Sequence, residues 1–295
     1  MQKLLIKGKK ELSGTILISG SKNASLPILA ASLLAKEVKL HNVPLVKDIF
    51  TMLELLKFIG VKIKIKNNKR SIILKNNKKI KTLAPYKLVK TMRAGVLVLG
   101  PLLTKYGKAK VSLPGGCAIG TRPVDLHLFA LKQLGAKIKI KDGYIIAEAK
   151  KGLNGSKIKF PSISVGATEN ALLAAYGAKG KTVLNNCAIE PEILDLISFL
   201  KKLGSEIKVN GRKIVIKGKS QSKKNISHKI IFDRIEAITY LIAGALVGKK
   251  ITINKIEPKV FKRETDLLKK MGIRMTILKN SISVSRPRNL KKIYI

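Results

Sequence analysis

A glycine-rich loop that contains a cysteine is the segment of this sequence best suited to chemistry. It spans residues 113–123 and reads LPGGCAIGTRP, with Arg122 and Pro123 at its end. Glycine lets the backbone approach a ligand closely, and proline before an apolar run predicts a helix start. A helix N-terminus and an arginine both favour anions and the thiolate form of Cys117. Two interpretations stay open: a reactive thiol that acts on an anion, or a small side chain buried under a turn.

Two further segments place cations at predicted helix starts. Lys22 and Asn23 precede a helix that we expect over Ser25–Ala35, where free backbone N–H groups favour an anion. Arg93 lies on an otherwise apolar helix expected over Lys90–Leu99, and its burial would require an anionic partner. The alternatives are an exposed lysine beside a capped helix and an arginine that reaches water from the first turn.

A third stretch, Ser162-Ile163-Ser164-Val165, enters a helix expected over Gly166–Tyr176. Its small residues could offer backbone donors to a ligand or simply cap the helix. Together with the cysteine thiol, the three cations Lys22, Arg93 and Arg122 suit a substrate that carries phosphate and carboxylate groups.

The three histidines, His41, His127 and His228, show no metal-ligand spacing, so surface or packing roles are favoured for them. No Ser/His/Asp or Cys/His catalytic arrangement is indicated. The only cysteines are Cys117 and Cys187, which argues against a disulfide framework and a structural zinc. The sequence has neither an apolar run long enough to cross a bilayer nor a signal-peptide core, so a cytoplasmic protein is expected.

Composition indicates a globular chain rather than a nucleic-acid binder. The length of 295 residues predicts about two domains. Hydrophobic residues make up 45% of the chain, which is enough to form buried cores. The formal charge is +43, but lysines alternate with isoleucine over Lys62–Lys66 and Lys137–Lys141, as on the solvated face of a strand. Aromatic residues are 4% and tryptophan is absent, so no stacking platform for bases is evident. Specific nucleic-acid binding is not expected, although weak binding at low salt is.

The sequence repeats a pattern in which a helix ends at a glycine and an alternating strand follows. The glycines are Gly60, Gly135, Gly204 and Gly272, at intervals of about seventy residues. Each suits the left-handed position just past a helix C-terminus. A second, more apolar helix begins each of the better-defined units, such as Arg234–Val247. The pattern favours an α/β protein built from a few units packed around buried helices.

These segments, in this order, resemble the enolpyruvyl transferase family, and within it the branch that uses UDP-N-acetylglucosamine. The resemblance covers essentially the whole chain. It rests on the cysteine loop, the most specific of the motifs, and on Ile18–Ala24, Leu88–Ala94, Ser164–Thr168 and Asp233–Glu236.

The resemblance implies transfer of enolpyruvyl from phosphoenolpyruvate to the 3′-hydroxyl of UDP-N-acetylglucosamine, the first committed step of peptidoglycan synthesis. Cys117 would be the proton donor and could form a covalent adduct, and Lys22 and Asn23 would bind phosphoenolpyruvate. No metal or organic cofactor is implied. At Ser162 the family usually has lysine, so a charge is lost there. The residues implied to bind UDP-N-acetylglucosamine are Arg93, Arg122, Pro123, Val124, Asp125, Leu126, Ser162, Ile163, Ser164 and Val165.

The resemblance also implies a fold of repeated βαβαββ units, the inside-out α/β fold of this family, with four of six units present. Residues 22–229 would form a complete three-unit domain, and residues 1–21 plus 230–295 an incomplete second domain with uncovered apolar helix faces. The expected chain is therefore truncated before the family's catalytic aspartate. An inactive or split-gene fragment that only binds the nucleotide sugar is the alternative, with a separately encoded C-terminal piece as a partner.

Overall fold

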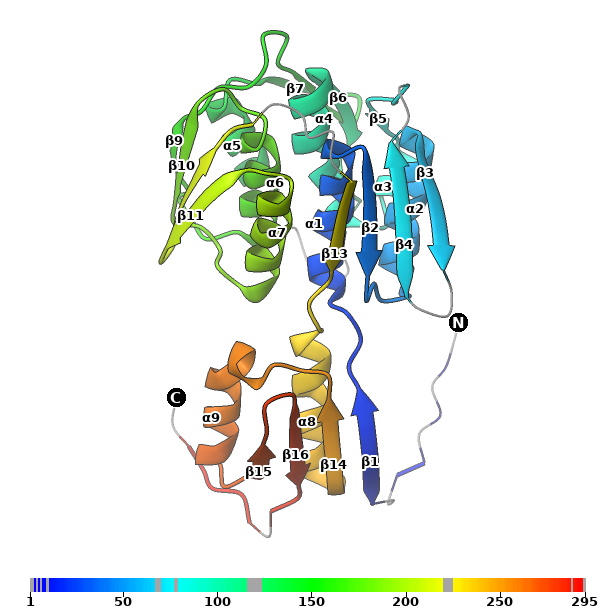
Figure 1. Ribbon diagram of the computed structural model, residues 1–295, viewed down its shortest axis with the longest axis vertical. Helices are drawn as coiled ribbons and strands as arrows, with labels where there is room; N and C mark the ends of the chain where they lie inside the picture. The colour runs from blue at the N-terminus through cyan, green and yellow to red at the C-terminus, as the bar shows by residue number, and fades with distance from the viewer. Residues whose placement is uncertain are drawn as a thin grey trace. The chain divides into compact units, whose positions relative to one another are not determined.

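The computed structural model describes residues 11–66, 70–76, 79–115, 124–219, 225–287 and 289–293, together with residues 3, 5, 7 and 8. The chain divides into two compact units (Figure 1). The larger unit is Ser21–Ile231, and the smaller unit is Met1–Gly20 together with Phe232–Ile295.

Within the described residues, four sheets of four strands share one topology. Each has a parallel pair whose second strand is followed by two antiparallel strands. In the larger unit the sheets are β13(Asn225–Lys229)-β2(Glu37–His41)-β4(Ser71–Asn76)-β3(Val61–Lys66), β5(Leu83–Ala84)-β6(Lys108–Ser112)-β8(Tyr144–Glu148)-β7(Lys137–Lys141) and β11(Glu206–Asn210)-β12(Lys213–Lys217)-β10(Lys181–Asn185)-β9(Lys157–Lys159). In the smaller unit the sheet is β1(Leu12–Leu17)-β14(Gly248–Asn254)-β16(Ser281–Ser285)-β15(Arg274–Ile277). The expected repeat of an α/β unit is confirmed.

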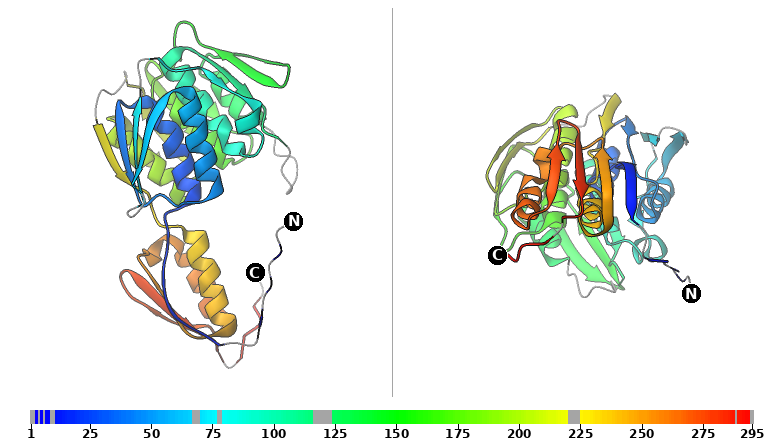
Figure 2. Two further views of the ribbon diagram at one scale, coloured as in Figure 1. Left: turned by 90° about the vertical axis from the view of Figure 1, so that its right-hand side faces the viewer. Right: turned by 90° about the horizontal axis from the view of Figure 1, so that it is seen from below.

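Helices fill the middle of the larger unit and the sheets surround them (Figures 1 and 2). Its helices are α1(Lys22–Ala31), α2(Lys47–Ile59), α3(Tyr86–Val89), α4(Leu99–Tyr106), α5(Asp125–Gln133), α6(Val165–Ala175) and α7(Pro191–Lys202), with 3-10 turns η1(Ser32–Leu34) and η3(Arg93–Val98). Burial runs without a break from Ala24 to Ala31 in α1 and from Ala167 to Ala175 in α6. α6 packs on α4 and α5, and α1 packs on α2 and α7. Small and aliphatic residues allow this close approach.

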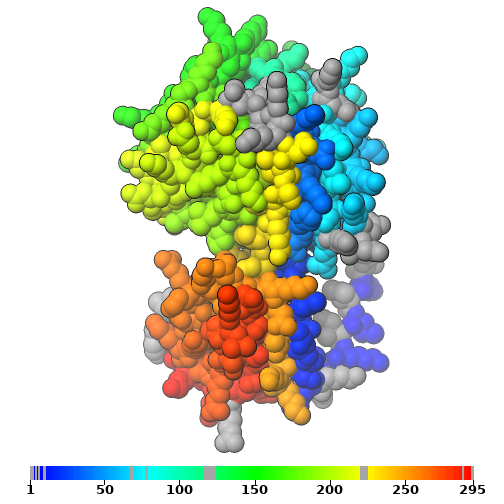
Figure 3. All heavy atoms as spheres, in the orientation of Figure 1, coloured from blue at the N-terminus to red at the C-terminus, as the bar shows by residue number. Residues whose placement is uncertain are grey.

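The strands that alternate lysine with isoleucine lie at the surface. In β3 and β7 most side chains are exposed or half-buried, and the lysines form solvated faces. In Figure 3, β13 (yellow) lies at the surface beside β2 (blue), its parallel partner. The charge of the chain is therefore spread over sheet faces, as the pattern predicts.

Helix ends follow the sequence signals closely in several places. The four repeated glycines all adopt positive φ, from +87° at Gly272 to +118° at Gly60, and each follows a helix. Pro191 is the first residue of α7, and α8 covers Arg234–Val247 as predicted.

Three expected helix boundaries are wrong. α1 begins at Lys22 rather than Ser25, because Ser21 is the N-cap and its hydroxyl accepts from the Ala24 N–H. The helix expected over Lys90–Leu99 is instead the 3-10 helix η3, which follows α3 and leads into α4, with Met92 in an extended conformation between α3 and η3. α5 begins at Asp125, after Pro123 rather than on it.

The smaller unit packs α8 and α9(Lys262–Lys270), with the 3-10 turn η4(Pro258–Phe261), against one sheet. Its core includes Leu241, Ile253 and Phe261. Glu236 in the first turn of α8 accepts hydrogen bonds from the Ser19 backbone N–H and hydroxyl, which ties the end of the N-terminal segment to the helix. α8 also carries large apolar side chains that are exposed: Ile235, Tyr240, Ile242, Leu246 and Val247.

A buried pair joins α7 to β13. His228 Nε2 donates to Asp195 Oδ1 at 2.9 Å, and the Ile231 N–H donates to Asp195 Oδ2 at 3.2 Å. Both side chains are buried, and the Phe199 ring meets His228 edge-on. Asp195 therefore accepts hydrogen bonds both from β13, the last strand of the larger unit, and from Ile231, which follows shortly after its end.

Replacement of Asp195 should destabilise the larger unit. Asp195→Ala leaves the His228 donor and the Ile231 N–H without their partner in the core, so the free energy of unfolding should fall by about 3 kcal/mol. Urea denaturation measures this change. Glu206→Ala is the control: it removes the exposed pair with Lys217 and should cost less than about 1 kcal/mol. Equal losses for the two variants would contradict the role given to Asp195.

A second buried acid, Glu169 in α6, should make stability depend on pH. Burial raises the pKa of Glu169 to about 8, and the nearby carboxylates of Glu192 and Glu190 add to the rise. Between the unfolded value of 4.5 and about 8, the folded chain keeps a proton that the unfolded chain loses. This residue therefore lowers the free energy of unfolding as the pH rises through that window.

Glu169→Gln removes the titration with little change of shape. We expect its advantage in unfolding free energy over the wild type to grow between pH 5 and pH 8, as followed by urea denaturation at each pH. Glu206→Gln, at an exposed position, should show no such trend. A constant difference for Glu169→Gln across this range would refute the raised pKa.

Candidate active site

Lys22 and Asn23 form the first turn of α1, directly after the N-cap Ser21. Lys22 Nζ makes an ion pair with Asp48 Oδ2 at 2.9 Å, and Asp48 lies in the first turn of α2. Both side chains are partly exposed. Lys22 is therefore held in place by the Asp48 carboxylate and is still accessible to a ligand from solvent. Asp48 could not be identified from local sequence signals, because only the packing of α1 on α2 brings the two side chains together.

Arg93 begins η3, in the region where the expected helix is interrupted. The start of the cysteine loop lies against the same region. A Cβ placed on Gly115 would lie 2.5 Å from the Lys90 carbonyl oxygen, so only glycine fits there. The structure thus brings the entry of the cysteine loop close to the segment that leads to Arg93.

Cys117, Arg122 and Pro123 lie outside the described residues. The loop leaves β6 and is followed by Val124 and α5. Val124 is buried, Asp125 is in the first turn of α5, and Leu126 packs partly against the core. From Val124 onward the chain therefore packs against the core again.

The stretch Ser162–Val165 is largely exposed at the start of α6. Ser164 is the N-cap: its hydroxyl accepts from the Ala167 N–H, and the Thr168 hydroxyl donates to its carbonyl. The capping alternative is thus correct for Ser164, and the exposed residues that lead into α6 remain available to a ligand. Because α5 packs on α6, residues 125–127 and this turn lie in the same part of the larger unit.

His127 is a residue at this place that the sequence did not single out. It is 2% exposed, and a Cβ on Gly166 would lie 2.9 Å from its Cε1 and 3.1 Å from its Nε2. Burial lowers the pKa of His127 to about 4, and the charge of Arg93 adds to this effect while Asp125 opposes it. The imidazole is therefore neutral at physiological pH, with its ring edge against the first turn of α6.

The other cysteine is in a different environment. Cys187 is buried, and burial raises the pKa of its thiol to about 11. Its thiol stays protonated at neutral pH and cannot serve as a nucleophile or a thiolate ligand.

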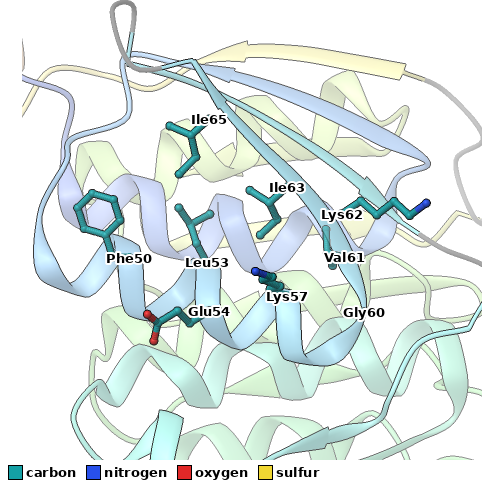
Figure 4. A pocket seen from close by; sticks show the side chains of 9 residues that line it. All are labelled: Phe50, Leu53, Glu54, Lys57, Gly60, Val61, Lys62, Ile63 and Ile65. Atoms are coloured by element: carbon teal, nitrogen blue, oxygen red, sulfur yellow. The ribbon is translucent and has the colours of Figure 1, made fainter.

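A cavity of about 580 Å³ lies between α2 and β3 and contains none of the predicted site residues (Figure 4). Phe50, Leu53, Ile63 and Ile65 line its apolar part. Across the described ranges, no three His, Cys, Asp or Glu side chains are grouped to hold a metal ion. No helix among those residues is both long and apolar enough to cross a membrane.

Comparisons with known proteins found a matching family model and similar proteins. The family model described as EPSP synthase (3-phosphoshikimate 1-carboxyvinyltransferase) matches residues 6–295. A UDP-N-acetylglucosamine 1-carboxyvinyltransferase from Pelagibacter ubique (strain HTCC1062) is 55% identical, over 100% of this chain and 70% of the relative. One of the same name from Rickettsia akari (strain Hartford) is 47% identical, over 99% of this chain and 70% of the relative.

The fold has solved counterparts. The crystal structure of the enolpyruvyl transferase NikO from Streptomyces tendae matches with a TM-score of 0.85 and 21% identity, over 96% of this chain and 68% of that one. EPSP synthase from Acinetobacter baumannii matches with a TM-score of 0.77 and 17% identity, over 98% of this chain and 68% of that one. With a family model that spans nearly the whole sequence and relatives at about half identity, the chain belongs to the enolpyruvyl transferase family.

Proposed function

We propose that this chain carries the site at which enolpyruvyl passes from phosphoenolpyruvate to the 3′-hydroxyl of UDP-N-acetylglucosamine, with release of phosphate. The observation that carries the proposal is the 55% identity, across the whole chain, to a protein named for this transfer. The chemistry of the predicted segments agrees, because cations, a thiol and two exposed helix starts suit a phosphorylated carboxylate and a nucleotide diphosphate.

In this proposal, different residues of the larger unit bind phosphoenolpyruvate and transfer the proton. Lys22 and Asn23, at the start of α1, bind the anionic groups of phosphoenolpyruvate. Cys117 delivers a proton to the methylene carbon while the sugar hydroxyl adds to the neighbouring carbon and gives up its proton to water. Phosphate then leaves, and the Cys117 thiolate takes back a proton from the new methyl group, which restores the double bond. Asp48 orients Lys22 through their ion pair.

The nucleotide sugar would be bound by a second set of residues. Two cations, Arg93 and Arg122, would attract its charged groups. Pro123 and the start of α5 would supply apolar contacts, and the start of α6 would supply backbone donors. The residues at those two helix starts are Val124, Asp125, Leu126, Ser162, Ile163, Ser164 and Val165. At Ser162 a hydroxyl is available in place of an ammonium group.

Binding of the nucleotide sugar without turnover is a second candidate for this chain by itself. The chain aligns with 70% of the length of its relatives, so its activity alone is a separate question from its family. Release of phosphate from the two substrates by the purified chain supports the first candidate. Stabilisation by UDP-N-acetylglucosamine without phosphate release supports the second, and rescue by a separately expressed C-terminal piece of the Pelagibacter relative would identify a split enzyme.

Loss of the loop thiol should remove turnover. Cys117→Ala eliminates the proposed proton donor, and phosphate release should fall by at least about a hundredfold, since a positioned general acid contributes that much. Cys187→Ala is the matched control, because that thiol is buried and stays protonated. The assignment of Cys117 is wrong if the two variants release phosphate at equal rates.

Loss of the lysine at the start of α1 should weaken phosphoenolpyruvate binding. Lys22→Ala removes a charge-assisted contact, so the affinity measured by calorimetry with UDP-N-acetylglucosamine present should fall about tenfold or more. Lys64→Ala, on the exposed face of β3, removes one charge from the same unit and should leave the affinity unchanged. An unchanged affinity in Lys22→Ala would exclude this lysine from the site.

A further inference from the structure

The buried amide of Asn170 connects three segments of the larger unit. Its Oδ1 accepts from the Gly100 N–H at 2.9 Å, and its Nδ2 donates to the Val96 carbonyl at 3.1 Å. Its Nδ2 also lies 3.3 Å from His127 Nδ1. Asn170 is fully buried on α6, Gly100 and Val96 belong to α4 and η3, and His127 belongs to α5.

The two backbone partners fix which end of the amide is oxygen. A backbone N–H can only donate and a carbonyl can only accept, so Oδ1 must face Gly100 and Nδ2 must face Val96. The second hydrogen of Nδ2 then points to His127 Nδ1, which must accept it. In a neutral imidazole that accepts at Nδ1, the proton is carried by Nε2.

His127 Nε2 is therefore a buried N–H donor, and it has no hydrogen-bond partner among the residues that the structure describes. A buried donor without a partner is costly, so its retention favours an acceptor that a bound ligand supplies. The ring edge lies against Gly166, in the first turn of the eleven-residue helix α6. That turn favours an anion, and the positive charge of Arg93 acts on the same imidazole.

We propose that Asn170 is a positioning residue that fixes His127 in the Nε2–H tautomer, so that this N–H donates to the diphosphate of the bound nucleotide sugar at the first turn of α6. The proposal rests on the proposed function for the identity of the ligand. The tautomer itself follows from the hydrogen bonds of the free chain and can be tested separately.

The tautomer is read by long-range ¹H–¹⁵N spectra of the full chain at neutral pH. Only three histidines are present, and the spectrum of His127→Gln assigns the signal. We expect a protonated Nε2 and an unprotonated Nδ1 for His127. Asn170→Asp places a carboxylate opposite Nδ1 and should move the proton to Nδ1. A wild-type His127 that is protonated at Nδ1 overturns the proposal.

The donor is tested by calorimetry with UDP alone as the probe. His127→Leu fills the space but has no N–H, so UDP affinity should fall about tenfold or more, as for a lost hydrogen bond to a charged group. His127→Gln keeps an N–H at similar reach and should bind within about threefold of the wild type. Thermal unfolding of each variant checks that the fold is kept.

The outcomes separate this inference from the function on which it rests. If wild-type chain binds UDP and His127→Leu binds it equally well, the donor role is wrong while the nucleotide site stands. If His127→Gln loses as much affinity as His127→Leu, the N–H is not what the ligand uses. If the wild type binds no UDP, the proposed nucleotide site fails and the donor role fails with it.

Discussion

The close packing of α6 inside the larger unit is the constraint on which the candidate site depends. α6 is buried from Ala167 to Ala175, yet the residues that lead into it, Ser162–Val165, are largely exposed. A Cβ on Gly100 would lie 2.7 Å from Asn170 Oδ1, so the backbone of α4 approaches α6 as closely as glycine allows. The same contact positions the segment of Arg93 and the ring of His127. The burial of α6 thereby sets the positions of η3 and α5 relative to the start of α6.

Acidic side chains are scarce in this basic chain, and several of them hold structural positions. There are 17 acidic and 60 basic residues. Asp48 holds Lys22, Asp195 holds β13 through His228, and Glu236 holds the segment that ends at Gly20 through Ser19. Other lysines, such as Lys64 and Lys139, lie exposed on strand faces. Each of these carboxylates binds a donor brought near by tertiary packing.

Much of the fold could be predicted from local signals. Glycines past helix ends and proline at a helix start act through the backbone of one or two residues, so Gly60 and Pro191 indicate their elements directly. Ser21 and Pro101 are also local signals: the first caps α1, and the second lies in the first turn of α4, which begins at Leu99. Pro101 thus indicates where α4 begins, but not the extended Met92 between α3 and η3.

The candidate site was predictable only in part. Segments such as Lys22-Asn23 and Ser162–Val165 could be found because charge or small residues coincide with a helix start. The Lys22–Asp48 pair and the His127–Asn170 contact could not, because 26 and 43 residues separate the partners and only tertiary packing brings them together. No spacing in the sequence indicates that an amide on one helix fixes the proton of an imidazole on another.

Hydrogen–deuterium exchange with and without UDP-N-acetylglucosamine tests most directly whether the exposed helix starts of the larger unit form the ligand site. We expect slower exchange at the start of α6 and around residues 124–127, with no change along Phe50–Ile65 at the α2–β3 cavity. Protection confined to that cavity, or no protection in the larger unit at saturating ligand, would contradict it.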